Sequence, residues 1–366
     1  MKRAFPVSKC GARSPWRRIA LMFLLLTTSA ACAEDFSWQI AGGQLINELQ
    51  GGSKTDTSSV EATYFFNGVD DELGPRALAP FLSRSSSVSP SFSRIQTHQR
   101  VAFTIPFTNE RIVYDAVQAT DVYAVEGRYV WGDSGWYVGG GLQYHDLPES
   151  PSTLSSIDSE KDGYKIIGGK YIGMSTAIEL LINSTQQTIE RSPAFNCLFP
   201  FPSSCASSGI FANTSTKTEE IAISARHVGG GSRLSYSISG GILERRNKFW
   251  SQTLLTAPAN PSPAFPATSY GGTIAGGYQA SGSTTGPTQR EYSVAGEIFP
   301  TVALGIRVGY TSYSDIGQLD DRYELAASWF FRRSVAAEFV FAKTEFGFGI
   351  SGASREEAAI RFSGRL

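Results

Sequence analysis

The sequence predicts an all-β protein, a transmembrane antiparallel up-and-down β-barrel of about 14 strands with short periplasmic turns and long extracellular loops. Three observations support this prediction. Segments of alternating apolar and polar residues recur along the chain, short and long connections between them alternate, and aromatic residues gather beside the short connections. We expect residues 34–366 to form this single barrel domain, with twelve or sixteen strands as the alternatives.

The alternation is clear in residues 121–131, DVYAVEGRYVW, where Tyr123, Val125 and Tyr129 fall on one face and Glu126 and Arg128 on the other. Successive side chains of a strand point to opposite faces, so each such segment has an apolar face and a polar face. A soluble sandwich would bury the apolar face, whereas an outer-membrane barrel turns it toward lipid. The same pattern predicts strands at 36–49, 57–67, 91–107, 115–131, 136–146, 162–172, 176–190, 217–228, 233–248, 289–299, 302–313, 321–331, 335–346 and 354–366.

The lengths of the connections favour the membrane barrel over the sandwich. Membrane barrels have tight turns on the periplasmic side and longer loops outside, and a sandwich has no reason to sort its connections in this way. The short connections are 132–135, 173–175, 229–232, 300–301 and 332–334, and the long ones are 147–161, 191–216 and 249–288. Aromatic residues beside the short turns are expected to form an interfacial girdle, namely Trp131, Trp136, Phe299, Trp329, Phe330 and Phe331.

The last segment, EAAIRFSGRL, predicts how the barrel closes. Ile360, Phe362 and Leu366 share one face, and Arg361 and Arg365 share the other. An unpaired strand edge in hydrocarbon leaves backbone polar groups unsatisfied. We therefore expect 354–366 to pair with 36–49, with the apolar face toward lipid and the arginines toward the lumen.

The N-terminal region indicates export. Residues 1–33 combine six basic residues and no acid with the apolar run IALMFLLLTTSA and the cleavage-like ACA. This pattern is typical of a signal peptide, because the apolar run is shorter than the ~20 residues that span a membrane. We expect cleavage after Ala33 and localisation in the bacterial outer membrane, with lipidation of Cys32 as the less favoured alternative.

The charge balance excludes one class of partner. The chain has 32 Lys and Arg against 33 Asp and Glu, so loss of the six basic residues in 1–33 leaves a net charge of about −7. Such a balance argues against nucleic-acid binding. The expected partners are outer-membrane lipid and lipopolysaccharide, the barrel-assembly machinery and small hydrophilic solutes, and we expect no cofactor and no metal site.

Inward-facing charges are the predicted functional content. Arg or Lys at mid-bilayer on the lipid face costs about 2–4 kcal/mol, and a position in the lumen relieves that cost. The alternative is that these charges pair with one another and only brace the wall. The predicted pore-lining charges are Glu126, Arg128, Glu179, Arg233, Glu297, Arg307, Arg322, Glu324, Glu338 and Arg361.

The segment EATYFFNGVDDELGPRALAPFLSRSSSVS, 61–89, resembles the putative porins of Gram-negative bacteria. The shared features are the aromatic residues at 64–66, Asp70, Gly74-Pro75 and Phe81-Leu82. The resemblance implies an outer-membrane barrel with a diffusion pore, and a homotrimer by analogy with porins of this size. It differs at the last residue, because such barrels usually end in Phe or Trp and this chain ends in Leu366.

Enzymatic chemistry is not expected. His145 and Asp146 are adjacent on a strand and so point to opposite faces, and the chain has no G-x-S-x-G, H-E-x-x-H or P-loop motif. The acidic run 68–74 does not have EF-hand spacing and is interpreted as a solvated turn. Residues 83–93 are interpreted as an irregular turn or a plug segment. The rival functions are a structural or adhesive barrel with binding loops, and a barrel-embedded hydrolase.

Cys197 and Cys205 are predicted to form a disulfide in an outside loop, with two free thiols as the alternative and a zinc site less favoured. They are the two cysteines that remain after cleavage of the signal peptide, and exported proteins are located in an oxidising compartment. So short a loop is expected to add about 2–3 kcal/mol to local stability. Alkylation of the exported protein followed by mass spectrometry should show no free thiol, and labelling of both cysteines would refute the pairing.

Overall fold

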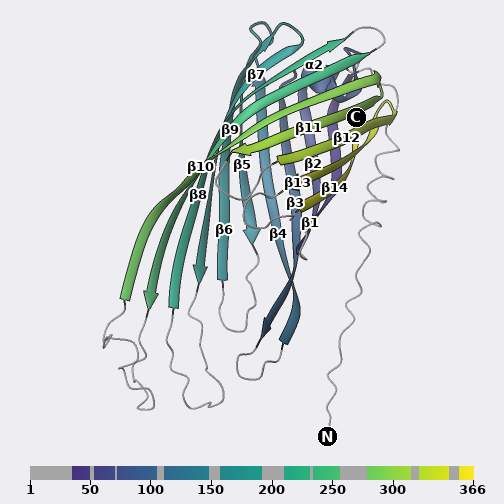
Figure 1. The fold of residues 1–366 in the computed structure, drawn as a ribbon. Helices are drawn as coiled ribbons and strands as arrows, with labels where there is room; N and C mark the ends of the chain where they lie inside the picture. The colour runs from purple at the N-terminus through teal and green to yellow at the C-terminus, as the bar shows by residue number, and fades with distance from the viewer. Residues whose placement is uncertain are drawn as a thin grey trace, which may run out of the picture.

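A computed structural model describes residues 35–49, 53–70, 72–104, 111–147, 157–191, 210–230, 234–255, 278–314, 321–345 and 354–366. Its fourteen strands form one closed antiparallel barrel in which each strand pairs with its neighbours in sequence, as predicted (Figure 1). The strands are β1 (Asp35–Leu49), β2 (Ser53–Asp70), β3 (Ser87–Thr104), β4 (Arg111–Val130), β5 (Trp136–Leu147), β6 (Ile157–Ile172), β7 (Thr176–Arg191), β8 (Ile210–Gly230), β9 (Ser235–Leu255), β10 (Tyr278–Thr301), β11 (Leu304–Ser314), β12 (Asp321–Arg332), β13 (Val335–Glu345) and β14 (Ser354–Arg365).

The barrel closes between β1 and β14, which confirms the predicted pairing of the two terminal strands. Their register runs from Gln39 opposite Arg365 to Leu49 opposite Arg355. Leu366 extends the ladder, because its N–H donates to the carbonyl of Trp38 at 2.9 Å and its carbonyl accepts from the N–H of Trp38 at 3.0 Å. No strand edge is left open at this seam.

The outer face carries a band of exposed apolar side chains at alternate positions. Leu142 on β5, Ile223 on β8 and Val308 on β11 are 65%, 58% and 61% exposed. Such positions are where a membrane barrel meets lipid. Tyr129, Trp131 and Trp136 lie on the same face beside the β4–β5 turn.

The prediction of the girdle is wrong for Phe299 and Phe330. They are 2% and 7% exposed, because each has the same strand parity as the inward-facing residues of its strand. Trp329 and Phe331, the two neighbours of Phe330 in the Trp-Phe-Phe run, are exposed on the outer face and stack edge to face at 5.8 Å. Proximity to a turn did not distinguish the two faces, whereas parity did.

Several strands are longer than predicted. β8 and β9 have 21 residues each and β10 has 24, although about 9–11 residues cross a membrane. Figure 1 shows these three strands continuing well past the end of β11. The extra residues are rich in Ser, Thr and charged residues, and pairing between strands satisfies their backbone outside the apolar band.

The connection between β2 and β3 is the long one at the end of the barrel where the other turns are tight. This short-turn end holds the β4–β5, β6–β7, β8–β9, β10–β11 and β12–β13 turns. The β2–β3 connection includes a 3₁₀ turn, η1 (Arg76–Leu78), and one helical turn, α2 (Ala79–Leu82). β3 begins at Ser87, so residues 87–93 belong to a strand. The interpretation of the whole run 83–93 as an irregular turn or plug is therefore wrong for these residues. No helix in the described residues is long and apolar enough to cross a membrane.

Candidate lumen and its constriction

The β2–β3 connection crosses the interior of the barrel at the short-turn end. We call residues 74–84 the constriction segment. The N–H of Arg76 donates to the carbonyl of Val302 in the β10–β11 turn at 3.0 Å. Leu78 packs with Val228 of β8 and Phe299 of β10. Since β10 is six or seven strands away from β2 and β3 around the wall, these contacts lie on the opposite side of the lumen.

Phe81 fills the middle of this crossing. Its ring centroid lies 5.4 Å from that of Tyr171 on β6, and the guanidinium of Arg226 on β8 lies 5.4 Å from the Phe81 ring. Cation–π contacts of this kind favour a fixed position for both groups. The ring is therefore held by both an aromatic and a cationic group of the inner wall.

Arg84 ends the crossing and returns the chain to β3. Its φ of 49° lies in the left-handed region, which costs a residue with a Cβ about 1 kcal/mol or more. The guanidinium donates to the carbonyl of Gly173 in the β6–β7 turn and lies 5.1 Å from the Tyr171 ring centroid. These contacts offset the strain and attach this end of the constriction segment to the wall.

Arg365 of β14 attaches the other end. Its Nη2 donates to the carbonyl of Arg76 at 2.7 Å. The guanidinium lies 4.5 Å from the Phe36 ring and 4.6 Å from the Phe330 ring, and the residue is only 6% exposed. The terminal strand thus closes the barrel and also holds the constriction segment.

The local sequence accounts for this path. Pro75 precedes η1 and Pro80 lies in the first turn of α2, where a missing N–H is tolerated. The apolar run Ala-Leu-Ala-Pro-Phe-Leu would be exposed in an ordinary turn, but Leu78 and Ala79 are 1% and 0% exposed inside the lumen. An apolar run in a connection on the short-turn side is the signal that sequence reasoning missed.

A second inward group lies on β5, β6 and β7. The Tyr137 hydroxyl donates a hydrogen bond to Glu179 Oε2 at 3.1 Å. To reach Glu179 on β7, the Tyr137 side chain of β5 crosses β6 at Gly169, which is the register partner of both residues. A Cβ at residue 169 would lie 2.3 Å from the Tyr137 ring, so only glycine allows this crossing. The guanidinium of Arg128 lies 5.4 Å from the centroid of the Tyr137 ring. Two of the predicted charges therefore meet at one tyrosine.

Most of the remaining inward charges are paired, as the bracing alternative predicted. The acids and bases are within contact distance across one or two strands of the wall. The pairs are Glu126–Lys165 at 2.5 Å, Glu220–Arg245 at 2.6 Å, Glu324–Arg307 at 2.6 Å, Glu357–Arg322 at 2.8 Å, Glu61–Arg361 at 2.8 Å and Glu297–Arg226 at 3.6 Å.

The inner face holds nine of the ten predicted pore-lining residues. Arg226 and Phe299 contact the constriction segment, so their positions identify the inward-facing residues of β8 and β10. The pairing between neighbouring strands then identifies the inward-facing residues of the other strands. Glu338 is among these residues and lies opposite Arg361. The part these residues play in transport stays a prediction. Arg233, Cys197, Cys205 and the expected signal peptide 1–33 lie outside the described residues.

The histidines do not assemble a site with Asp146. His145 has inner parity and Asp146 the opposite parity on β5. His98 lies on the outer face, 3.7 Å from Asp56, and His227 shares a 2.9 Å hydrogen bond with Thr176. The described residues contain no group of three or more His, Cys, Asp or Glu that could hold a metal ion.

Comparison with solved structures places this fold among known barrels. The TodX deltaS2S3 mutant, a monoaromatic hydrocarbon channel, has a TM-score of 0.51 at 7% identity and covers 92% of this chain and 91% of its own. The chain has the fold of an outer-membrane β-barrel. Omp33 of Acinetobacter baumannii matches with a TM-score of 0.49 at 13% identity over 92% of this chain and 100% of its own. No protein-family model and no curated protein matches the sequence.

Proposed function

We propose that the chain is an outer-membrane channel for the passive diffusion of small hydrophilic solutes and ions. The observation that carries this proposal is the inner wall, where ionised pairs such as Arg307–Glu324 and Arg361–Glu61 are partly exposed. Charged groups are stable inside a membrane protein where water reaches them. A lumen lined in this way suits polar solutes better than apolar ones.

The constriction segment adds a condition to this function. Its contacts with β6, β8, β10 and β14 cross the lumen and narrow it. On this proposal, solutes pass freely to the periplasm when the segment moves aside. The segment is attached by a few hydrogen bonds and stacked rings rather than by a strand ladder. Such contacts break more easily than the wall, and the channel is therefore a gated one.

The same segment favours the rival function of a structural or adhesive barrel. If the segment never leaves, the lumen does not conduct and the outside loops become the functional part. The embedded hydrolase is the weaker rival, because the described histidines lie apart from one another on different strands and faces. Conductance in a planar bilayer distinguishes a channel from both rivals.

We predict weak ion selectivity in that experiment. Paired inward charges largely cancel, and selectivity depends on the net charge at the narrowest ring. Refolded protein in a tenfold KCl gradient should give discrete conductance steps with a reversal potential close to zero. A reversal potential near the limiting value for one ion would contradict the prediction, and the absence of any conductance would contradict the proposed function.

A further inference from the structure

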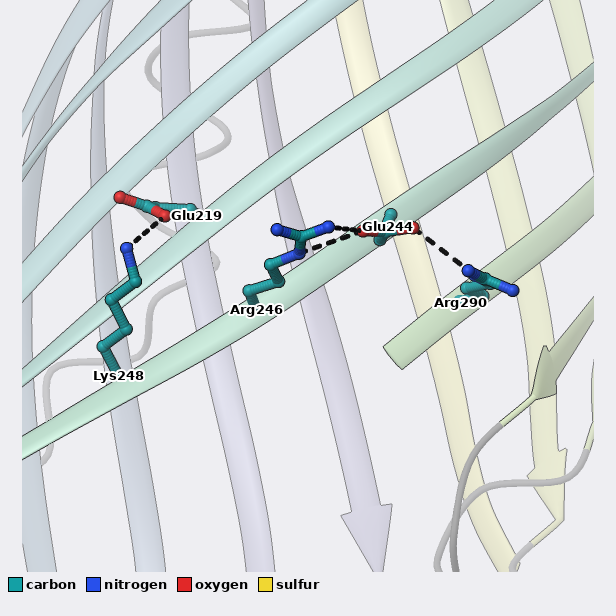
Figure 2. A network of polar contacts seen from close by, with 5 residues as sticks. All are labelled: Glu219, Glu244, Arg246, Lys248 and Arg290. Atoms are coloured by element: carbon teal, nitrogen blue, oxygen red, sulfur yellow. Dashed lines mark hydrogen bonds and ion pairs between the residues drawn. The ribbon is translucent and has the colours of Figure 1, made fainter. Parts of the chain in front are cut away.

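A cluster of charges lies on the outside of β8, β9 and β10. We call it the basic cluster, formed by Lys217, Arg246, Lys248 and Arg290 with Glu219 and Glu244. Figure 2 shows five of these residues, with Glu244 between the two arginines. Arg246 Nη2 lies 2.6 Å and Arg290 Nε 3.4 Å from the two oxygens of Glu244. Glu219 bridges the two lysines in the same way, at 2.9 Å each.

The register places the basic cluster on the lipid-facing side of the wall. Glu244 of β9 lies opposite Ile221 of β8 and Arg290 of β10. Two positions earlier on β9, Ile242 lies opposite Tyr292 of β10. Ile221, Ile242 and Tyr292 are 52%, 53% and 43% exposed and belong to the apolar outer band. The basic cluster therefore begins at the next outward position along each of the three strands.

The basic cluster lies where a membrane span ends. β9 begins at Ser235 at the short-turn end, and Glu244 comes about nine residues later, close to the 9–11 residues that cross a membrane. On this count the cluster stands at the headgroup level of the leaflet farther from the short turns. In an outer membrane with periplasmic short turns, that is the outer leaflet.

The bridging carboxylates assemble cations that would otherwise repel one another. Four cations and two anions leave a net charge of about +2. Hydrogen bonds from Lys248 and Lys217 lower the pKa of Glu219 to about 2, so the bridge stays ionised at neutral pH. The lysine and arginine side chains are 41–58% exposed, while Glu219 and Glu244 are only 35% and 28% exposed. The cations thus present free donors to the surroundings.

Other outer-face charges near this level are balanced or acidic. Arg94 on β3 pairs with Asp121 on β4 through two hydrogen bonds of 2.7 and 2.6 Å. Lys343 on β13 pairs with Glu345 and has Glu356 of β14 as its register partner. An anionic ligand is thus attracted to the β8–β10 side of the barrel in preference to these two places.

We propose that the basic cluster binds the phosphate groups of an outer-leaflet lipid of the lipid A type, which carries phosphates above several acyl chains. Guanidinium and ammonium groups bind phosphate oxygens by charge-assisted hydrogen bonds. The acyl chains then lie against Ile221, Ile242 and Tyr292. The proposal rests on the outer-membrane placement of the barrel but not on its transport activity.

The test is retention of lipid A by purified protein in detergent, measured by native mass spectrometry. We expect diphosphoryl lipid A to bind about tenfold more weakly to the quadruple variant Lys217→Gln, Arg246→Gln, Lys248→Gln, Arg290→Gln than to the unchanged protein. Monophosphoryl lipid A should bind the unchanged protein with intermediate affinity. Heat-modifiable migration on a gel verifies that the quadruple variant is folded. If the quadruple variant does not fold, the milder double variant Arg246→Gln, Lys248→Gln replaces it in the binding measurement.

The matched control removes two exposed cations elsewhere on the outer face, in Lys54→Gln, Arg94→Gln, and should retain lipid A as the unchanged protein does. Equal retention by the quadruple variant, or an equal loss in the control, overturns the proposal. Displacement of lipid A by low millimolar inorganic phosphate would indicate a site for soluble anions and overturns it as well. Because lipid retention is the readout, a barrel that conducts no ions still gives a clear result.

Discussion

Removing the apolar contacts of the constriction segment is expected to raise the time-averaged current through a single channel at least twofold. In the variant Leu78→Ser, Phe81→Ser, the segment loses its packing on Val228, Phe299 and Tyr171. Truncating a buried Leu or Phe typically costs about 2–5 kcal/mol. That loss falls on the segment rather than on the strand ladder, so the open state becomes more populated while the barrel stays closed. The measurement is the time-averaged single-channel current in a planar bilayer, with the open fraction and the unitary current recorded separately.

The control for this experiment is Leu73→Ser, which makes the same change just outside the constriction segment at a side chain that is 46% exposed. Its conductance should match that of the unchanged protein. A second variant, Arg365→Gln, removes the donor to the Arg76 carbonyl and should raise the open fraction in the same direction. Unchanged currents in both the double serine variant and Arg365→Gln would show that the segment does not gate the lumen and would favour the structural barrel.

Deleting residues 357–366 is expected to abolish assembly rather than to weaken it. β14 pairs with both β1 and β13, so its loss leaves two open edges. Each unpaired backbone group in hydrocarbon costs several kcal/mol, and the sum exceeds the stability of a typical domain. The deletion also removes Arg365, which holds the constriction segment. Heat-modifiable migration of membrane fractions on a gel reports whether a folded barrel has formed.

Point variants at the same strand separate the two faces. Phe362→Asp places a charge on the lipid-facing side and should reduce the folded fraction strongly. Arg361→Ala removes a partly exposed ion pair with Glu61, at 45% and 39% exposure, and such pairs contribute about 1 kcal/mol at most. A truncated chain that still migrates as a closed barrel would show that β14 is not essential. A milder defect in Phe362→Asp than in Arg361→Ala would mean that the faces are reversed.

Local sequence pattern was sufficient to determine the barrel. The fourteen alternating segments predicted the strand count, with twelve and sixteen as alternatives, and the pattern at 354–366 predicted the closure of β14 on β1 and the faces of Phe362 and Arg361. Parity is a property of a single strand, because adjacent side chains point to opposite faces whatever the partner strand is. Nine predicted charges consequently lie on the inner face.

Only the tertiary structure decided what fills the lumen and which charges meet. Parity placed Arg307 and Glu324 inside, but the register between β11 and β12 brought them within 2.6 Å. Whether the segment 74–84 folds into the lumen could not be predicted from the sequence, because no periodic pattern in it indicates which part of the wall it contacts. Its partners Val228, Phe299 and Arg365 lie far along the chain, and they surround it only once the sheet has closed into a cylinder. A contact between residues so distant in sequence depends on the closed wall, and no local periodicity encodes it.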